Sequence, residues 1–213
     1  MRKIFTIGLL FLVITLQAQD LKSLYVSIPD SLSPLLTDVN RQDFGDFLSS
    51  NMKAEVKNRF GKTSEMLQLS SDYLKLRLTS VSSVEMKLLP VNDSTKIICV
   101  AKTYQGPVSD TQISFYSTDW RKLNEKDFID LPTKEDFFIA STKPELIDSL
   151  EYAKAQADIH LMQAVLSENK QTLEFTYTMP DYLDKTTAVK VRKYVLESPL
   201  LYEWSDGHFS RKK

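Results

Sequence analysis

The feature that most constrains the fold of this chain is residues 73–120, where four short segments alternate apolar and polar side chains between turn signals. In the first segment, leucine recurs at every second position, while Lys75 and Arg77 occupy the positions between. This period of two is that of a strand with one buried and one solvated face. Because turns separate the segments, the stretch predicts an antiparallel meander rather than parallel strands joined by helices.

The third segment, residues 96–104, has a continuous apolar centre from Ile97 to Ala101. Such a run is typical of a strand that is covered on both faces, so we place it centrally in the sheet. Cys99, the single cysteine of the chain, lies in this run. We therefore expect a small buried side chain there, with a catalytic thiol as the alternative.

Before the meander, the sequence predicts elements that cover the sheet or extend it. Pro34 suits the first turn of a helix, where its missing N–H needs no partner, so we place Ser33 at the N-cap. The expected elements are an edge strand at 24–28, a helix from Ser33, a helical turn at 42–50 and two short strands at 52–60 and 64–69.

After the meander, Thr142-Lys143-Pro144-Glu145 has the pattern of a capping box that opens a helix. A second alternating pair of segments then predicts a hairpin with one buried face. The expected elements are a helix ending near Ala157, a hairpin of 159–166 and 172–179, a helix capped by Asp181 or Asp184 and running through Leu196, a strand at 200–204 and a frayed tail at 205–213.

The N-terminus has the pattern of a signal peptide, since Met1-Arg2-Lys3 precedes the apolar residues 4–16 and a cleavage site that ends at Ala18. An uncleaved anchor is the alternative, but the apolar stretch is short for a bilayer core of about 30 Å. We therefore expect a periplasmic or secreted protein whose mature chain begins at Gln19. We expect no transmembrane span in that mature chain.

These patterns predict an α+β fold, mainly antiparallel, with covering helices. Each half of the chain can be read as a helix, a hairpin and a strand ending in tryptophan, so the two halves are possible duplicates; a chance likeness between α+β segments is the alternative. The expected divisions are a signal peptide at 1–18, an N-terminal half at 19–120, a charged connecting segment at 121–141 and a C-terminal half at 142–213.

From the composition we expect several kinds of binding site to be absent. The net charge is −1 and no basic stripe with interleaved aromatics occurs, so we expect no nucleic-acid partner. The five glycines form no phosphate-binding loop. His160 and His208 are the two histidines, and no metal-ligand spacing occurs around them, so we expect no metal and no cofactor. We expect His160 to be packed within an apolar strand.

One aromatic group, Phe115, Tyr116 and Trp120, is a candidate for ligand binding. Tyrosine and tryptophan combine a large apolar area with a polar atom, which suits the wall of a binding groove. The alternative is that the three residues form the rim of the core between the sheet and its helices. No residue pattern singles out a catalytic group.

Five groups of short segments carry a resemblance to known proteins: Asn40-Arg41-Gln42-Asp43-Phe44 with Asp46-Phe47, Ser50-Asn51-Met52-Lys53-Ala54 with Val56, Lys87-Leu88-Leu89-Pro90, Ile97-Ile98-Cys99-Val100 with Thr103-Tyr104, and Phe115-Tyr116 with Trp120. In these segments the chain resembles a family of exported proteins of unknown function from Bacteroidetes. The resemblance covers most of residues 24–210 and implies a periplasmic or secreted protein, with no catalytic residues to transfer.

Three functions remain open from the sequence. The first is a non-catalytic binding or assembly module of a bacterial envelope, whose partner would be an envelope protein or a glycan. It predicts a groove or an open sheet edge lined by aromatic side chains. The second is a hydrolase whose carboxylates or serine meet only in the fold; it predicts a deep pocket with converging polar groups, one of which has a shifted pKa. The third is a homo-oligomeric structural protein with a large apolar face.

Overall fold

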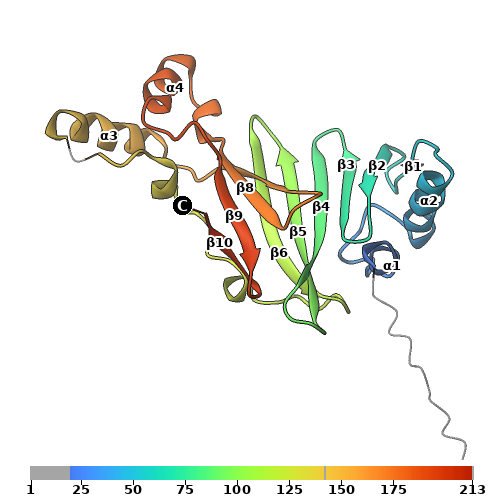
Figure 1. Cartoon of the computed structure of the whole chain (residues 1–213). Helices are drawn as coiled ribbons and strands as arrows, with labels where there is room; N and C mark the ends of the chain where they lie inside the picture. The colour runs from blue at the N-terminus through green and yellow to red at the C-terminus, as the bar shows by residue number, and fades with distance from the viewer. Residues whose placement is uncertain (1–19, 142, 213) are drawn as a thin grey trace, which may run out of the picture.

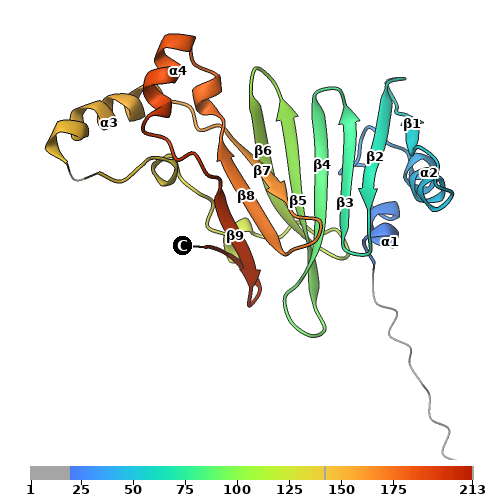
Figure 2. The same cartoon turned by 45° about the horizontal axis from the view of Figure 1, so that its top comes forward.

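The computed structural model describes residues 20–141 and 143–212, and the predicted signal peptide lies outside these residues. The described part of the chain forms two antiparallel sheets, of six and four strands, with four α-helices around them (Figures 1 and 2). The prediction of an α+β fold that is mainly antiparallel is therefore confirmed.

The predicted meander forms the larger part of the six-stranded sheet, in which strands pair in chain order. These strands are β1 (Glu55–Lys57), β2 (Thr63–Leu69), β3 (Tyr73–Thr79), β4 (Ser82–Pro90), β5 (Lys96–Gln105) and β6 (Ser109–Ser117). In β5, Ile97, Ile98 and Cys99 are all buried, as expected for a strand covered on both faces. The two short strands predicted before the meander are β1 and β2.

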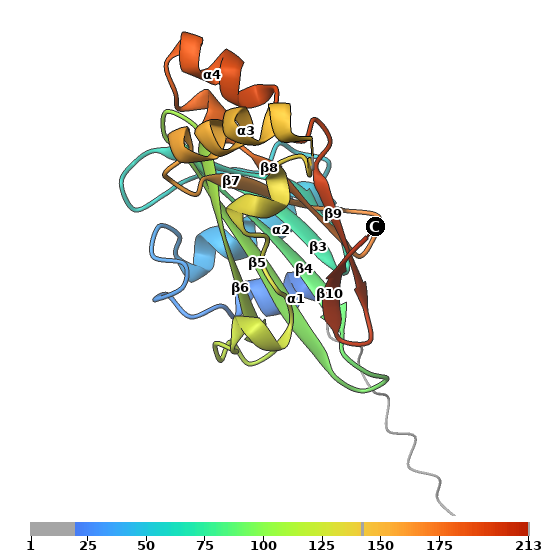
Figure 3. The same ribbon diagram turned by 90° about the vertical axis from the view of Figure 1, so that its left-hand side faces the viewer.

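The two faces of this sheet have different environments, and residue number decides which face a side chain joins. The registers of β3–β6 pair residues of like parity over most of their length. Odd-numbered side chains such as Cys99 and Phe115 pack toward the second sheet. Even-numbered side chains such as Leu76 and Met86 pack toward the N-terminal segment. Figure 3 shows that segment, in blue, on one side of β5 and β6, with β9 and β10 on the other.

The second sheet has the order β10-β9-β8-β7. Its strands are β7 (Met162–Leu166), β8 (Thr172–Tyr177), β9 (Leu200–Ser205) and β10 (His208–Arg211). The predicted hairpin is confirmed, but the predicted frayed tail is wrong, because β10 pairs with β9. Asp206 and Gly207 both have positive φ, as a tight hairpin turn requires, so Asp-Gly was the signal for this hairpin.

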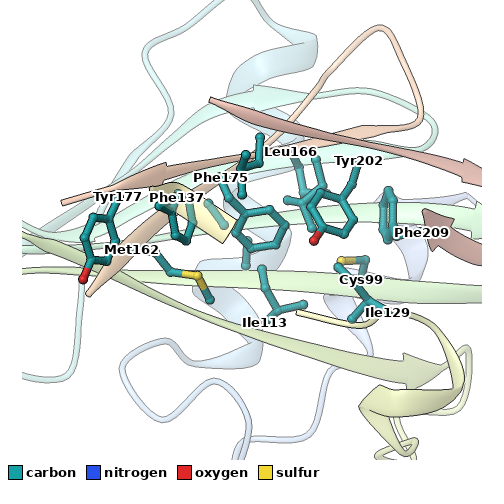
Figure 4. Close-up of a cluster of buried hydrophobic side chains, with 14 of the residues drawn as sticks. Cys99, Ile113, Ile129, Phe137, Met162, Leu166, Phe175, Tyr177, Tyr202 and Phe209 are labelled. Carbon is teal, nitrogen blue, oxygen red and sulfur yellow. The ribbon is translucent and has the colours of Figure 1, made fainter. Parts of the chain in front are cut away.

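The core between the two sheets also includes the segment predicted to connect two halves. Figure 4 shows Ile129 and Phe137, from residues 121–141, among the side chains of both sheets. Both side chains are almost fully buried. Short 3-10 helices, η1 (Glu125–Asp127) and η2 (Lys134–Phe137), position them. The parts of the chain before, within and after this segment therefore share one hydrophobic core.

The edge strand β7 lies across β4–β6, and side chains of the larger sheet satisfy its outer N–H groups. The Met162 N–H donates to Asp110 Oδ1 at 3.3 Å, the Ala164 N–H to Thr111 Oγ1 at 3.0 Å, and the Leu166 N–H to Glu85 Oε2 at 2.8 Å. A buried N–H without a partner destabilises a fold, so these acceptors allow a sheet edge to rest on another sheet.

Replacing Thr111 with valine should lower the free energy of unfolding by about 1–3 kcal/mol. Valine keeps the shape of threonine but leaves the buried Ala164 N–H without an acceptor, and it also removes the contact with Thr103 Oγ1 at 2.9 Å. Thr176→Val, at an exposed position of β8, is the matched control and should change stability little. Urea unfolding of both variants measures the difference, and equal stabilities would contradict this role of Thr111.

The residues predicted as an edge strand at 24–28 are instead largely helical, so that prediction is wrong. α1 (Leu21–Val26) begins after Asp20, whose carboxylate accepts from the Ser23 N–H. Leu21, Leu24 and Tyr25 follow a helical spacing and are all buried against the sheet. The N-cap and this spacing outweigh the β-propensity of the segment.

The prediction of a helix that begins at Ser33 is also wrong. Residues 30–36 form turns, and α2 (Asp38–Ser49) begins after Thr37. Thr37 and Asn40 form a reciprocal capping box, in which the Asn40 N–H donates to Thr37 Oγ1 at 3.1 Å and the Thr37 N–H donates to Asn40 Oδ1 at 3.2 Å. This box places the helix start later than the proline signal did, and the predicted turn at 42–50 belongs to the same helix.

Two further helices lie together beyond the end of the second sheet (Figure 1). α3 (Pro144–Gln156) begins with proline and ends before Ala157, as predicted; Thr142 of the expected capping box lies outside the described residues. α4 (Lys185–Arg192) follows η3 (Met179–Asp181) and is capped by the Asp184 carboxylate, one of the two expected caps. It ends before the predicted Leu196.

Candidate functional site

A groove of about 380 Å³ lies between the even-numbered face of the six-stranded sheet and the N-terminal segment. Its volume falls within the range of about 300–1,000 Å³ that is usual for small-molecule sites. We call residues 26–36 the strap, because they close one side of this groove. Strands β3–β6 supply the floor: Leu76, Leu78, Ser82, Val84, Met86, Val100, Lys102, Tyr104, Gln112, Ser114 and Tyr116.

Arg41 of α2 holds the strap at both ends. Its guanidinium donates to the carbonyl oxygens of Val26, at 3.3 Å, and Leu36, at 2.9 Å. It also pairs with the Asp30 carboxylate at 3.1 Å, while its own side chain is only 4% exposed. A planar guanidinium has donors enough for several acceptors at once, so this one side chain binds three points of the strap. The backbone N–H of Arg59 also holds the strap, by donating to the Leu35 carbonyl at 2.9 Å.

Trp120 and Tyr116 form the apolar end of the groove. Their ring centroids are 6.0 Å apart, and the Trp120 indole N–H donates to the Leu24 carbonyl at 3.0 Å. Trp120 also has a φ of 62°, a left-handed conformation that costs a non-glycine residue roughly 1–2 kcal/mol. The turn after β6 therefore directs this side chain back under α1.

Tyr25 of α1 lines the groove with an unusual polar group. Its side chain is 2% exposed, and its hydroxyl is buried without a hydrogen-bond partner among the described residues. Burial raises the pKa of this hydroxyl far above its ordinary value, and the Arg41 charge and the Ser33 side chain have smaller opposing effects. Tyr25 therefore contributes a buried aromatic wall to the groove, with the Ser33 side chain of the strap near its hydroxyl.

The groove is polar at its other end. Ser82 and Tyr104 are paired across β4 and β5, and Lys102 pairs with Gln112 across β5 and β6. The Lys102 ammonium lies over the Tyr104 ring, 5.7 Å from its centroid. Among the described lining residues, Lys102 carries the one charge, and no Asp, Glu, His or Cys lines the groove with it.

The structure separates the three aromatic residues that the sequence grouped. Tyr116 and Trp120 line the groove. Phe115 lies on the opposite face of β6, fully buried, where its ring contacts Phe128 and Phe209 in the core between the sheets. Consecutive residues of a strand have side chains on opposite faces of the sheet, so the side chains of Phe115 and Tyr116 lie in different environments.

Sequence reasoning missed Tyr25, Arg41 and Lys102. Lys102 was detectable, because it continues the series Ile98, Val100 and interrupts an apolar face with a charge. Tyr25 and Arg41 left no comparable signal, since their roles depend on contacts with distant segments. His160, expected within a strand, is instead exposed before β7, next to the rings of Phe137 and Tyr177.

A larger hollow, of about 740 Å³, lies beside α4 and β9–β10. Three of the four basic side chains that line it already hold ion pairs, which neutralise much of its charge. These pairs are Arg192–Asp181, Arg211–Asp136 and Lys212–Glu203. All are at least partly exposed to water, where such charges contribute little binding energy. The groove under the strap is therefore the stronger candidate for a ligand site.

Two other features bear on the chemistry available. Cys99 is fully buried, as expected, and burial raises the pKa of its thiol far above the ordinary value. Within residues 20–141 and 143–212, no three His, Cys, Asp or Glu side chains gather as metal ligands. No helix in the same ranges has the length and apolar character needed to cross a bilayer.

Residues 13–209 match the model of a family described as "Protein of unknown function (DUF3256)". The chain belongs to this family. The family description assigns no ligand, reaction or partner, and no curated protein matches the chain. A solved structure of a domain of an uncharacterized protein from Porphyromonas gingivalis W83 is similar, with 28% identity and a TM-score of 0.80. The match covers 92% of this chain and 98% of that domain, so the fold extends over both nearly completely.

Proposed function

We propose that this chain is a non-catalytic binding module of a bacterial envelope, exported by its N-terminal leader, that holds a small and mainly apolar molecule beneath the strap. The observation that carries this proposal is a groove of ligand size, about 380 Å³, whose lining is mainly apolar and includes a few hydroxyl groups and one lysine. Binding sites of this kind combine apolar walls with a few well-placed polar groups. The groove has both.

The groove supports binding better than catalysis. A hydrolase needs a nucleophile beside a general base, and its base is most often a histidine or a carboxylate. The described lining residues include serine hydroxyls and Lys102, but no such base. An envelope protein, which with a glycan is one of the two partners expected from the sequence, would bury about 800 Å² of each surface, whereas the groove has the volume of a small-molecule site.

The neutral fluorescent probe N-phenyl-1-naphthylamine tests this site directly. Its fluorescence should rise on binding to the wild-type protein. Ser114→Phe places a ring in the floor of the groove and should weaken binding roughly tenfold or more, since packed sites have little space for an added ring. Ser210→Phe, at an exposed position of β10, is the matched control and should bind as the wild type does.

Folding of each variant is checked by thermal unfolding before binding is compared. Val100→Phe fills the same groove from β5 and keeps the test decisive if Ser114→Phe does not fold. The proposed site is contradicted if the wild type does not bind the probe, or if folded groove variants bind it with unchanged affinity.

A further inference from the structure

The groove is apolar at one end and positively charged at the other, along the direction of the strands. Tyr116 of β6 lines the apolar end, opposite the buried Ile98 of β5, and Trp120 packs beside Tyr116. Four residues further along β5, Lys102 lies between Val84 and Gln112. At about 3.4 Å per residue, these two ends are about 14 Å apart.

Lys102 differs in its ion pairing from two other partly or fully buried lysines of the same sheet. On the odd-numbered face, Lys75 and Lys87 are paired with carboxylates, at 2.9 Å in both cases. The ion pairs of the described residues do not include Lys102, whose ammonium lies over the Tyr104 ring. A partly covered ammonium next to an apolar floor is complementary to an anionic group on an apolar molecule.

Resting on the proposed binding function, we infer that the groove selects anionic amphipathic molecules: compounds with an unbranched apolar body and one carboxylate-like head group. The apolar body lies along the floor toward Tyr116 and Trp120, and the head group pairs with Lys102. Serine side chains also line the groove, from β4, β6 and the strap. Lys102 is then the residue that determines specificity for charge.

Decanoate and decanol test this inference, since they share a chain length and differ in the charge of the head group. Each is titrated against the full-length mature protein carrying bound N-phenyl-1-naphthylamine, at neutral pH, where the acid is ionised. Decanoate should displace the probe at roughly three- to tenfold lower concentration than decanol, as expected for an ion pair that is partly shielded from water. Raising the salt concentration should narrow this difference.

Lys102→Met keeps the apolar stem and removes the charge, so decanoate and decanol should displace the probe from this variant at equal concentrations; the ratio of the two is measured on the same variant and does not depend on its affinity for the probe. Lys96→Met, an exposed lysine of the same strand outside the groove, is the control and should leave the preference unchanged. Equal displacement by both compounds, displacement by neither, or an undiminished preference in Lys102→Met would overturn the ligand class. If the wild type does not bind the probe at all, the proposed function itself is overturned.

Discussion

Replacing Phe115 with alanine should lower the free energy of unfolding by about 3–5 kcal/mol, because the ring is fully buried and its removal leaves a cavity between the two sheets. The ring also contacts Phe128, at a centroid distance of 5.1 Å, and aromatic pairs add to the energy of burial. Urea or thermal unfolding measures this loss.

The adjacent residue supplies the matched comparison. Tyr116→Ala changes the opposite face of the same strand, where the side chain is only partly buried and lines the groove. It should cost clearly less stability than Phe115→Ala and should weaken binding of N-phenyl-1-naphthylamine to the folded protein. Equal losses of stability in the two variants would contradict the assignment of Phe115 to the core and Tyr116 to the groove.

Replacing Arg41 with methionine should have the second large effect, a loss of about 2–4 kcal/mol of unfolding free energy. Methionine retains much of the apolar stem but leaves the Val26 and Leu36 carbonyls without their donor. The strap should then exchange its backbone amides with solvent faster than in the wild type, because its ends are no longer held. Hydrogen–deuterium exchange over residues 26–36 measures this directly.

Arg59→Met is the control for this experiment. Arg59 also pairs with Asp30, at 2.6 Å, but its side chain is 45% exposed and its loss should matter much less. If the two variants exchange the strap amides at the same rate, the strap is held by its own packing and not by Arg41. Probe binding should weaken in Arg41→Met in parallel with the faster exchange.

Strand pattern was the most predictable part of the fold. The alternation at Leu74, Leu76 and Leu78 and the apolar run in β5 are local signals, and burial of one face requires them whatever the partner is. The wrong predictions of helix positions arose where a capping side chain set the start of a helix, and the apolar pattern or a proline indicated another place. Asp20 and Thr37 begin helices that the apolar pattern and Pro34 did not place, and Asp206-Gly207 turns the chain into a strand.

The candidate site was only partly predictable. Tyr116 and Trp120 were named because of their chemistry, and they lie together. Phe115 was grouped with them because it is adjacent in sequence, which in a strand places it on the other face. The division of the chain into two similar halves stays a prediction, although residues on both sides of the connecting segment share one core.

By itself, the sequence determined the antiparallel meander and which side chains of each strand lie on the same face, because a period of two is a local property of the chain. Only the tertiary structure decided what covers each face. Trp120 bonds to Leu24, 96 residues earlier, and the Leu166 N–H bonds to Glu85, 81 residues earlier. Such contacts depend on how distant segments pack: the first holds α1 beside the groove, and the second holds β7 on the opposite face of the sheet.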